Sequence, residues 1–505
     1  MKTKILNFKK NAVMLIICST MFLVITPNIH AQTVMPNVRV NTADYNEVSL
    51  DGAAKSIAVL NDTVYAVWSG EPTDTTSNIY FAKSINEGSS FSADLNIFQG
   101  PDSILHTLPS LAVAQNGNIY ITWTAVSNNE NDYNIWFIKS TDGGNTFQTP
   151  IHITTNNAFF YSCIGAYNNN VYIFYADASN YPVADYYFVR STNNGDSFES
   201  PIQINDAPCI GNIEFDGLST LAIDASGNIY LAWVDGRRAN GNGDIFFAKS
   251  TDSGQSFSAN IIVNDVSQPG ADSVQYKPSI AVDTSNNVYI SFTDKRLGDN
   301  WINNRAYMAK SNNGGSTFAT ESLLVDYDGT CYFHNITASP NGKLSVAICA
   351  HISPNWGVWL FESTNGGSDF SIPVALCDSF NNNFSDIRIV LNSDEEVFAL
   401  WQDDREGFGN IYFSRTDLGV NINESTFDNE SILYPNPTNG SFTVNTPNND
   451  TNIEITVCNL QGQIIYKKLY GNTSSFNINI EMPQGIYFVA IKSNDKIKTL
   501  KLIKN

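Results

Sequence analysis

Residues Ser250–Phe257 have the sequence STDSGQSF and follow the apolar segment DIFFAK, so on their own they resemble an ordinary polar turn. The chain repeats nearly the same eight letters six times, at spacings of 51 to 61 residues. The other five copies are SINEGSSF from Ser84, STDGGNTF from Ser140, STNNGDSF from Ser191, SNNGGSTF from Ser311 and STNGGSDF from Ser363. A repeat of this period indicates an architecture built from stacked supersecondary units.

Each box has Asp or Asn at its third position, Gly at the fifth and Phe at the eighth. A short carboxylate or amide can accept hydrogen bonds from nearby backbone N–H groups, and glycine allows a positive φ. The phenylalanine supplies a large apolar side chain for the neighbouring sheet. We therefore predict a turn that is held together by its own side chains.

The same order of strands surrounds each box. Around Ser250, an apolar strand, a hairpin turn, a strand ending in Trp233, a longer loop, DIFFAKS, the box and NIIVN follow one another, which predicts a four-stranded propeller blade. The sequence resembles the Asp-box family, also called BNR repeats, known from sialidases, some other glycosidases and several non-enzymatic β-propellers. The resemblance implies that Asp252 and its equivalents are scaffold residues and do not act as catalytic acids.

We predict an all-β chain with seven blades, a count that depends on how the ring closes. The seventh unit, ending in NIYFSRTDLG, lacks a fourth strand, while the segment MPNVRVNTAD near the start has the pattern of a fourth strand with no blade before it. Pairing the two would place Val38 and Val40 beside the sheet of Trp401 and Tyr412 and would hide two sheet edges. Familiar sialidases have six blades, and a six-bladed ring is the alternative.

Residues 1–31 have the pattern of a secretory signal peptide: four lysines, an uncharged apolar run from Ala12 to Ile25, and a small residue before Gln32. The run is too short for a spanning helix, and we predict no membrane-spanning segment. Removing residues 1–31, which hold four lysines and no Asp, Glu or Arg, takes the formal net charge from −21 to −25. Such an acidic chain is a poor nucleic-acid partner.

The six cysteines after residue 31 allow disulfides in an exported protein. Cys163 and Cys349 lie in apolar strands, where buried thiols are expected, whereas Cys331 and Cys377 lie near loops and are the better disulfide candidates. No CxxC, HExxH or paired-histidine spacing supports a metal site, and we expect no cofactor. The DYDG segment from Asp326 is only a weak calcium signal.

The domain organisation follows from these patterns: a signal peptide at 1–31, a propeller at 32–419, a polar linker at 420–431 and a small β-sandwich at 432–505. Three motifs of the last part, YPNP from Tyr434, GIYFV from Gly485 and a lysine-rich final strand, resemble the type IX secretion sorting domain of Bacteroidetes. The resemblance implies contact with the secretion machinery and a secreted or cell-surface protein. A sandwich that merely binds a ligand is the alternative.

Candidate ligand residues lie at the ends of second strands, on the face opposite the boxes, in the motifs WVDGRR, FTDKR and WQDDR. Three basic groups converging there could bind a carboxylate or sulfate. The alternative is that each arginine braces its own loop. The candidates for the ligand site are Asp235, Arg237, Asp294, Arg296, Asp403 and Arg405; Arg238 follows Arg237.

Residues that break the symmetry of the repeat on this face are candidates for catalysis. They are Glu71, His106, Glu214, Asp216, Tyr276 and His334. Likeness to sialidases would imply an arginine cluster, a tyrosine nucleophile and an acidic pair, for which Tyr276, Glu214 and Asp216 are the available types. The family's early Arg-Ile-Pro motif is missing, because Arg39 belongs to a fourth strand.

Three functions remain open from the sequence. The first is a secreted propeller that binds carbohydrate or another extracellular ligand on its loop face. The second is an exo-acting glycoside hydrolase of sialidase type acting on acidic glycans. The third is a structural surface protein without a small ligand.

Overall fold

The computed structural model describes residues 33–505 apart from short segments. The segments left out are 51–54, 74–75, 101–103, 128–132, 155–158, 181–182, 211–218, 239–242, 268–273, 297–303, 325–330, 408, 418–431, 447–452, 460–463, 472–473, 482 and 494–495. The predicted signal peptide and linker therefore lie outside the described residues. All described elements are β-strands, and no helix that could span a membrane is found among them.

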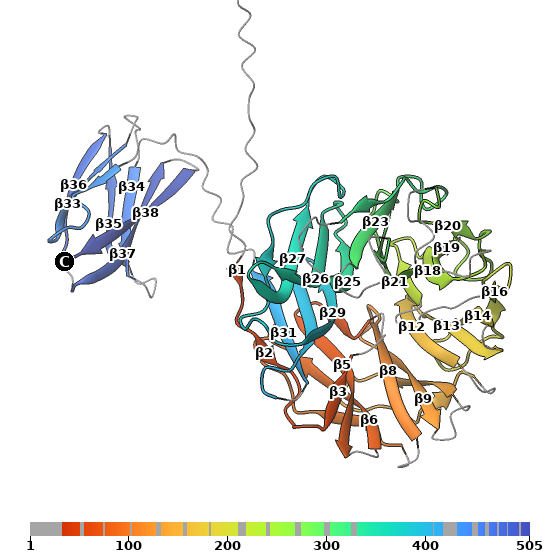
Figure 1. The fold of residues 1–505 in the computed structure, drawn as a ribbon. Coiled ribbons are helices and arrows are strands. Elements are labelled where there is room, and N and C mark those ends of the chain that lie inside the picture. Colours follow the sequence, from red (N-terminus) through yellow and green to blue (C-terminus); the bar gives the residue numbers. More distant parts are fainter. Residues whose placement is uncertain are drawn as a thin grey trace, which may run out of the picture. The chain divides into compact units, whose positions relative to one another are not determined.

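Seven antiparallel sheets, numbered as blades 1 to 7, make up the unit that ends at Leu418 (Figure 1). Blade 1 contains β3 (Glu47–Ser49), β4 (Ile57–Leu60), β5 (Thr63–Thr73), β6 (Thr76–Ser84) and β7 (Leu95–Phe98). Blade 2 contains β8 (Ile104–Val113), β9 (Ile119–Ser127), β10 (Tyr133–Ser140) and β11 (Ile151–His152). Blade 3 contains β12 (Phe159–Tyr167), β13 (Asn170–Asn180), β14 (Val183–Ser191), β15 (Ile202–Gln203) and β16 (Cys209–Ile210).

The remaining four blades repeat this order. Blade 4 contains β17 (Ser219–Ile223), β18 (Ile229–Asp235), β19 (Asp244–Ser250) and β20 (Ile261–Ile262). Blade 5 contains β21 (Gln275–Val282), β22 (Val288–Asp294), β23 (Arg305–Ser311) and β24 (Ser322–Leu323). Blade 6 contains β25 (Cys331–Ala338), β26 (Leu344–Ile352), β27 (Asn355–Ser363) and β28 (Val374–Ala375), and blade 7 contains β29 (Phe384–Leu391), β30 (Val397–Asp403) and β31 (Asn410–Asp417).

The N-terminal strands complete blade 7. β1 (Thr33–Val34) and β2 (Val38–Arg39) both pair with β31, with Thr33 opposite Asp417 and Arg39 opposite Tyr412. The predicted pairing of the first strand with the last blade is confirmed. The innermost strands of successive blades contact one another, and β29 contacts β4, so the sheets form a closed ring (Figure 1).

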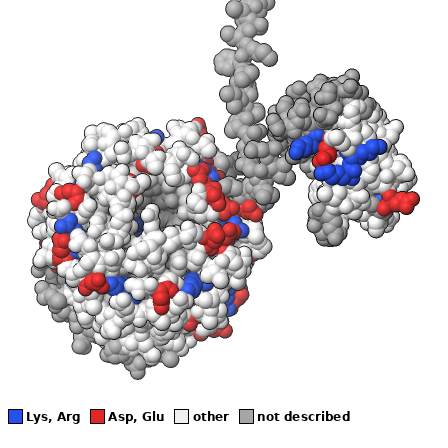
Figure 2. Space-filling model, turned by 180° about the vertical axis from the view of Figure 1, so that it is seen from behind, with Lys and Arg blue, Asp and Glu red and all other residues white. Residues whose placement is uncertain are grey.

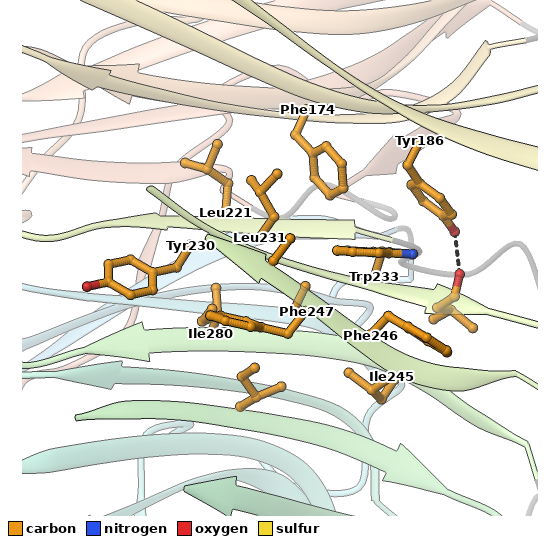
Figure 3. Packing of buried hydrophobic residues seen from close by; sticks show 14 of the residues in the cluster. Phe174, Tyr186, Leu221, Tyr230, Leu231, Trp233, Ile245, Phe246, Phe247 and Ile280 are labelled. Carbon is orange, nitrogen blue, oxygen red and sulfur yellow. Dashed lines mark hydrogen bonds between the residues drawn. The ribbon is translucent and has the colours of Figure 1, made fainter. Parts of the chain in front are cut away.

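Aromatic side chains fill the spaces between blades. Trp233 of β18 is fully buried and lies beside Phe174 and Tyr186 of blade 3, with ring centroids 6.1 and 5.8 Å away (Figure 3). On its other side it stacks on Phe246 of its own blade at 6.2 Å. The large, fully buried aromatic residues at the ends of second strands therefore join one blade to the next.

The repeated box forms the predicted turn, which is held together by hydrogen bonds between its own side chains and backbone. Ser250 Oγ donates to Asp252 Oδ1 at 2.7 Å and accepts from the Gly254 N–H at 2.8 Å. Asp252 Oδ1 also accepts from the Ser256 N–H at 3.0 Å. The same three bonds occur in all six boxes, beginning at Ser84, Ser140, Ser191, Ser250, Ser311 and Ser363.

Each box also contacts the preceding blade. The box residue Phe257 lies edge-on against Phe188 of β14, with centroids 4.8 Å apart, and Gly254 lies over the same ring at φ +80°. A Cβ on Gly254 would meet Phe188 Cε1 at 2.5 Å. In blade 1 the equivalent ring belongs to Phe413 of blade 7, so the boxes also connect the two ends of the ring.

The second unit, Gly419–Asn505, is a small β-sandwich. One sheet contains β32 (Ile432–Tyr434), β33 (Ser441–Asn445) and β36 (Ser475–Asn479); the other contains β34 (Ile453–Cys458), β35 (Ile464–Tyr470), β37 (Gly485–Ser493) and β38 (Lys496–Lys504). Their shared core includes Phe442, Val457 and Val489. Asn436 of the YPNP motif bonds the backbone of Lys501 and Ile503, which joins two of the predicted motifs.

Replacing Gly254 by alanine tests the inter-blade role of the box. We expect Gly254→Ala to lower the free energy of unfolding by about 1–3 kcal/mol more than Gly117→Ala, because Phe188 must move. Gly117 is the matched control, since its φ is +82° but no atom lies within 4 Å of its Cβ position. Urea unfolding of both variants measures the difference, and equal losses would contradict the packing role.

Candidate functional site

The alternating strand directions create two faces of the ring. The six boxes follow third strands and lie on one face, which we call the box face. The opposite face, the mouth face, carries the ends of second strands, the starts of third strands and the connections between blades. Asp235, Asp294 and Asp403 are the last residues of β18, β22 and β30 and belong to the mouth face. Acidic and basic side chains surround the hollow centre of the ring (Figure 2).

Each arginine of the three Asp-x-Arg motifs binds the aspartate two residues before it. Arg296 donates from Nε and Nη2 to Asp294 Oδ2 at 2.9 and 2.5 Å, and its backbone N–H donates to Oδ1 at 2.6 Å. The guanidinium group also lies 4.2 Å above the ring of Tyr307. Arg237 and Arg405 make the same contacts with Asp235 and Asp403, and they stack on Phe246 and Tyr412.

A second carboxylate completes each arrangement and connects two blades. Arg296 donates to Glu321 at 2.6 Å, and Glu321 accepts from the backbone N–H of Asp265, which follows the fourth strand of blade 4. Arg237 and Arg405 reach the preceding blade directly, through Asp206 and Asp378. The arginines therefore hold neighbouring fourth strands together at the mouth face.

These contacts correspond to the brace alternative for the Asp-x-Arg motifs. Each guanidinium group donates hydrogen bonds to the aspartate of its own motif and to a second carboxylate near a fourth strand. The three arginines therefore have separate partners. The residues Asp235, Arg237, Asp294, Arg296, Asp403 and Arg405 therefore form three separate ion-pair sets, one in each of blades 4, 5 and 7. Repetition at equivalent blade positions favours a structural role for these motifs.

Removal of one brace tests this assignment. We expect Arg296→Gln to lower the free energy of unfolding by about 3–5 kcal/mol, because it leaves the buried carboxylates of Asp294 and Glu321 without their cation. Arg190→Gln is the control, since its partner Glu199 is half exposed and such pairs contribute about 0–1 kcal/mol. Urea unfolding of the two variants gives the comparison; similar small losses would rule out the brace.

A different group of basic and polar residues gathers on the mouth face around Tyr276, one of the predicted catalytic candidates. Tyr276 of β21 is buried, and its hydroxyl accepts a 2.7 Å hydrogen bond from Asn304 Nδ2. Lys295, directly after β22, has its ammonium group 5.1 Å from the centre of the Tyr276 ring. Lys277 follows Tyr276 and lies 3.8 Å above the ring of Phe333 in blade 6.

The group, which we call the Tyr276 cluster, consists of Tyr276, Lys277, Lys295, Asn304, Arg305 and His334. Lys277 has a φ of +54° at an irregularity where β21 loses register with β22. A positive φ at a register irregularity also occurs in the first strands of blades 2, 3 and 7, at Leu108, Tyr161 and Asp386, so this conformation belongs to the repeated blade geometry. Lys295 lies inside the FTDKR motif of the sequence, whereas no motif marks Lys277 or Arg305.

Two buried polar atoms of the Tyr276 cluster have no hydrogen-bond partner among the described residues. They are Oδ1 of Asn304 and Nε2 of His334. His334 Nδ1 lies 3.3 Å from Thr293 Oγ1. An unpaired buried polar atom costs about 1–3 kcal/mol, so these two atoms are available to a ligand or to water.

Other candidates from the sequence lie elsewhere. His106 of β8 is fully buried in an aromatic cluster of blade 2, where Trp123 Nε1 donates to its Nδ1 at 2.9 Å. Glu71 lines a separate pocket of about 120 Å³ with Glu47, its cross-strand neighbour. Glu214 and Asp216 lie outside the described residues, as does the DYDG segment from Asp326.

The described cysteines form no disulfide, so the prediction for Cys331 and Cys377 is wrong. Cys331 begins the first strand of blade 6 and Cys377 follows the fourth, and strands at opposite edges of a sheet are too far apart to be bridged. Burial raises the pKa of Cys331 to about 12. Cys163 and Cys349 are buried thiols as predicted. Among the described residues, no cluster of metal-binding side chains occurs.

Protonation of His334 is expected to destabilise the propeller. Burial, with the nearby charges of Lys277 and Arg388, lowers the pKa of His334 to about 4, whereas an unfolded histidine has a pKa near 6.5. The unfolded chain therefore binds a proton first, and up to about 3 kcal/mol of stability is lost as the pH falls from 6.5 to 4.

The variant His334→Gln should show a shallower loss of unfolding free energy across this window, by up to about 1.4 kcal/mol per pH unit. Urea unfolding at pH 7, 5.5 and 4.5 provides the measurement. His152→Gln, at an exposed position of β11, is the control. Parallel pH profiles for wild type and His334→Gln would contradict the prediction.

Similar proteins support two parts of this description. Residues 432–505 match the family model of a secretion system C-terminal sorting domain. An ulvan lyase of a new polysaccharide lyase family, bound to -[GlcA(1-4)Rha3S]-, is 13% identical, with 74% of this chain and 95% of that chain covered and a TM-score of 0.53. Polysaccharide lyase Uly1 is 11% identical, with 78% and 95% covered and a TM-score of 0.50.

A mutant of the NanB sialidase from Streptococcus pneumoniae is 12% identical, with 76% of this chain and 70% of that chain covered and a TM-score of 0.42. No curated protein sequence matches the chain. At these identities the two lyases share the fold of the ring. Residues 432–505 are thus a secretion system C-terminal sorting domain, and the chain is a secreted, surface-attached protein whose larger unit is a β-propeller.

Proposed function

We propose that this exported propeller binds acidic carbohydrate on its mouth face, at the Tyr276 cluster. The observation that carries the proposal is the convergence of three basic side chains from three strand ends: Lys277 on β21, Lys295 after β22 and Arg305 on β23. Lys295 lies over the Tyr276 ring and Lys277 over the Phe333 ring, while Arg305 donates to the backbone of Asn304, on a chain with a formal net charge of −21. The negative net charge of the protein repels an acidic ligand, so a local group of cations provides a favourable place for it to bind.

The cluster offers the contacts that a sugar acid or sugar sulfate requires. Ammonium and guanidinium groups form charge-assisted hydrogen bonds with carboxylate and sulfate oxygens. The unpaired Oδ1 of Asn304 can accept from a sugar hydroxyl, and His334 Nε2 can donate or accept according to its tautomer. The Lys277 ammonium is held over the Phe333 ring at 3.8 Å, which reduces the ordering cost of binding.

Fold relatives are consistent with an acidic glycan. The ulvan lyase with a TM-score of 0.53 is a propeller-like structure bound to a uronate and sulfated-sugar unit. The likeness extends to the fold alone, so the ligand class rests on the charges of the Tyr276 cluster. Export to the cell surface, indicated by the sorting domain, would bring the site into contact with extracellular polysaccharide.

An exo-acting glycoside hydrolase of sialidase type is the second proposal, with Tyr276 as nucleophile. Its support is the position of the Tyr276 hydroxyl inside the basic cluster. A phenol needs a base to become a nucleophile, and the group seen at 2.7 Å is the Asn304 amide, which donates to the oxygen. The proposed acidic partners, Glu214 and Asp216, are expectations from the sequence, and the binding function is therefore preferred.

A charge-removal variant tests the binding proposal. We expect Lys277→Gln/Lys295→Gln in the full-length chain to weaken binding of uronate-containing or sulfated oligosaccharides at least tenfold, which corresponds to about 1.4 kcal/mol. Isothermal titration with acidic and neutral oligosaccharides measures the effect. Lys343→Gln, which removes the same kind of charge next to Glu362, is the matched control.

The same samples distinguish the alternatives. Binding with no product, lost in the double variant, supports the module. Release of product that Tyr276→Phe abolishes while binding persists supports the hydrolase. Equal binding of neutral and acidic sugars, or full binding by the double variant, would refute the Tyr276 cluster as the site. Absence of binding to every oligosaccharide would favour a structural surface protein.

A further inference from the structure

The axis of the ring is hollow. A cavity of about 620 Å³ is lined by the innermost strands of all seven blades, β4, β8, β12, β17, β21, β25 and β29. Most of its lining residues are aliphatic, and none of those described is Asp or Glu. Two are cations, Lys55 and Arg388.

In blades 2, 5 and 6, a polar residue at an equivalent position connects the innermost strand to that of the next blade. Ser110, Ser279 and Asn335 each accept, through a side-chain oxygen, the backbone N–H of an isoleucine in the next blade, at 3.3, 3.2 and 2.9 Å. The inner edge of a first strand has no sheet partner, so these side chains satisfy backbone groups that would otherwise be unpaired. We call them the belt residues.

Where the ring closes, the position equivalent to the belt residues holds an arginine. By its position before Ile389, Arg388 is the belt residue of blade 7, but a guanidinium group has only donors and cannot accept a backbone N–H. It donates to its own chain at Ile387 O and lies 3.7 Å from Asp386. The contact between β29 and β4 brings this position next to blade 1.

On the blade 1 side, the motif Ser56-Ile-Ala-Val matches the belt motif Ser279-Ile-Ala-Val. The Ser56 hydroxyl is fully buried and has no hydrogen-bond partner among the described residues. Lys55 precedes it, and its ammonium group makes no hydrogen bond or ion pair with any residue that the structure describes. Burial lowers the pKa of Lys55, as expected for a cation that lacks a counter-charge.

We propose that the central channel binds one oxyanion, which Lys55 and Arg388 hold at the junction of blades 7 and 1. The two cations line a cavity in which no described lining residue is Asp or Glu, and the Asp386 carboxylate, 3.7 Å from Arg388, balances one of the two charges. The ligand class is a sulfate, phosphate or carboxylate group, either as a free ion or as a substituent of a sugar. The site is independent of the Tyr276 cluster, because no residue is shared.

Selenate, a sulfate analogue that scatters anomalously, identifies the site directly. We expect crystals of the full-length protein soaked in selenate to give an anomalous peak between Lys55 Nζ and the Arg388 guanidinium group. The peak should vanish in Lys55→Met, and the Kd for sulfate measured by titration calorimetry should rise at least tenfold. Lys343→Met is the control for the loss of one lysine.

A second measurement guards against a folding defect in the variant. Lys55→Met removes an unpaired buried charge, so in anion-free buffer its melting temperature should equal or exceed that of the wild type. Sulfate should then raise the wild-type melting temperature more than that of the variant, since sulfate also stabilises proteins nonspecifically.

Competition experiments with bound selenate distinguish a free anion from an anionic group on a sugar. Displacement of selenate by inorganic sulfate indicates a free ion, and displacement only by glucuronate or a sulfated monosaccharide indicates a group on a glycan; both outcomes support the site. Water alone between Lys55 and Arg388, or identical sulfate affinity in Lys55→Met, would overturn it.

Discussion

The contact between each box and an apolar side chain of the preceding blade, a phenylalanine for five boxes and Met308 for the box of blade 6, is the interaction on which the ring depends. The serine and the Asp or Asn of the box fix the turn, and this places the glycine directly over the neighbouring ring. Only a residue without Cβ fits there. Because the contact passes from one blade to the next, it sets the spacing between sheets, and at Phe413 it also joins the last blade to the first.

Different kinds of contact stabilise the two faces of the ring. On the box face, backbone turns and aromatic rings maintain the spacing. On the mouth face, the Asp-x-Arg braces join the fourth strands, each with a fully buried aspartate and a stacked guanidinium group. With both rims fixed by repeated contacts, the residues that do not repeat are the ones available for binding, and they gather near the axis and between blades 5 and 6.

The charges of the residues that do not repeat indicate what they bind. The chain is strongly acidic, yet its unrepeated mouth-face residues and its channel carry cations. Several of these cations are held over aromatic rings or at irregular strand positions, so their location is fixed before a ligand arrives. A secreted protein with such sites is suited to recognising acidic groups on extracellular polymers, and the sorting domain accounts for its export.

The sequence by itself determined the strand order, the box geometry, the closing role of Val38 and the sorting domain, because each depends on local residue types that recur or on motifs within one segment. It also named Tyr276 as a candidate. Only the tertiary structure decided that Arg237, Arg296 and Arg405 are braces, that Cys331 and Cys377 remain free, and that Lys55 and Arg388 share the channel. Those facts depend on distances between residues of different blades. The repeat in the sequence predicts that the blades form, but it does not say which side chains meet where blade 7 contacts blade 1.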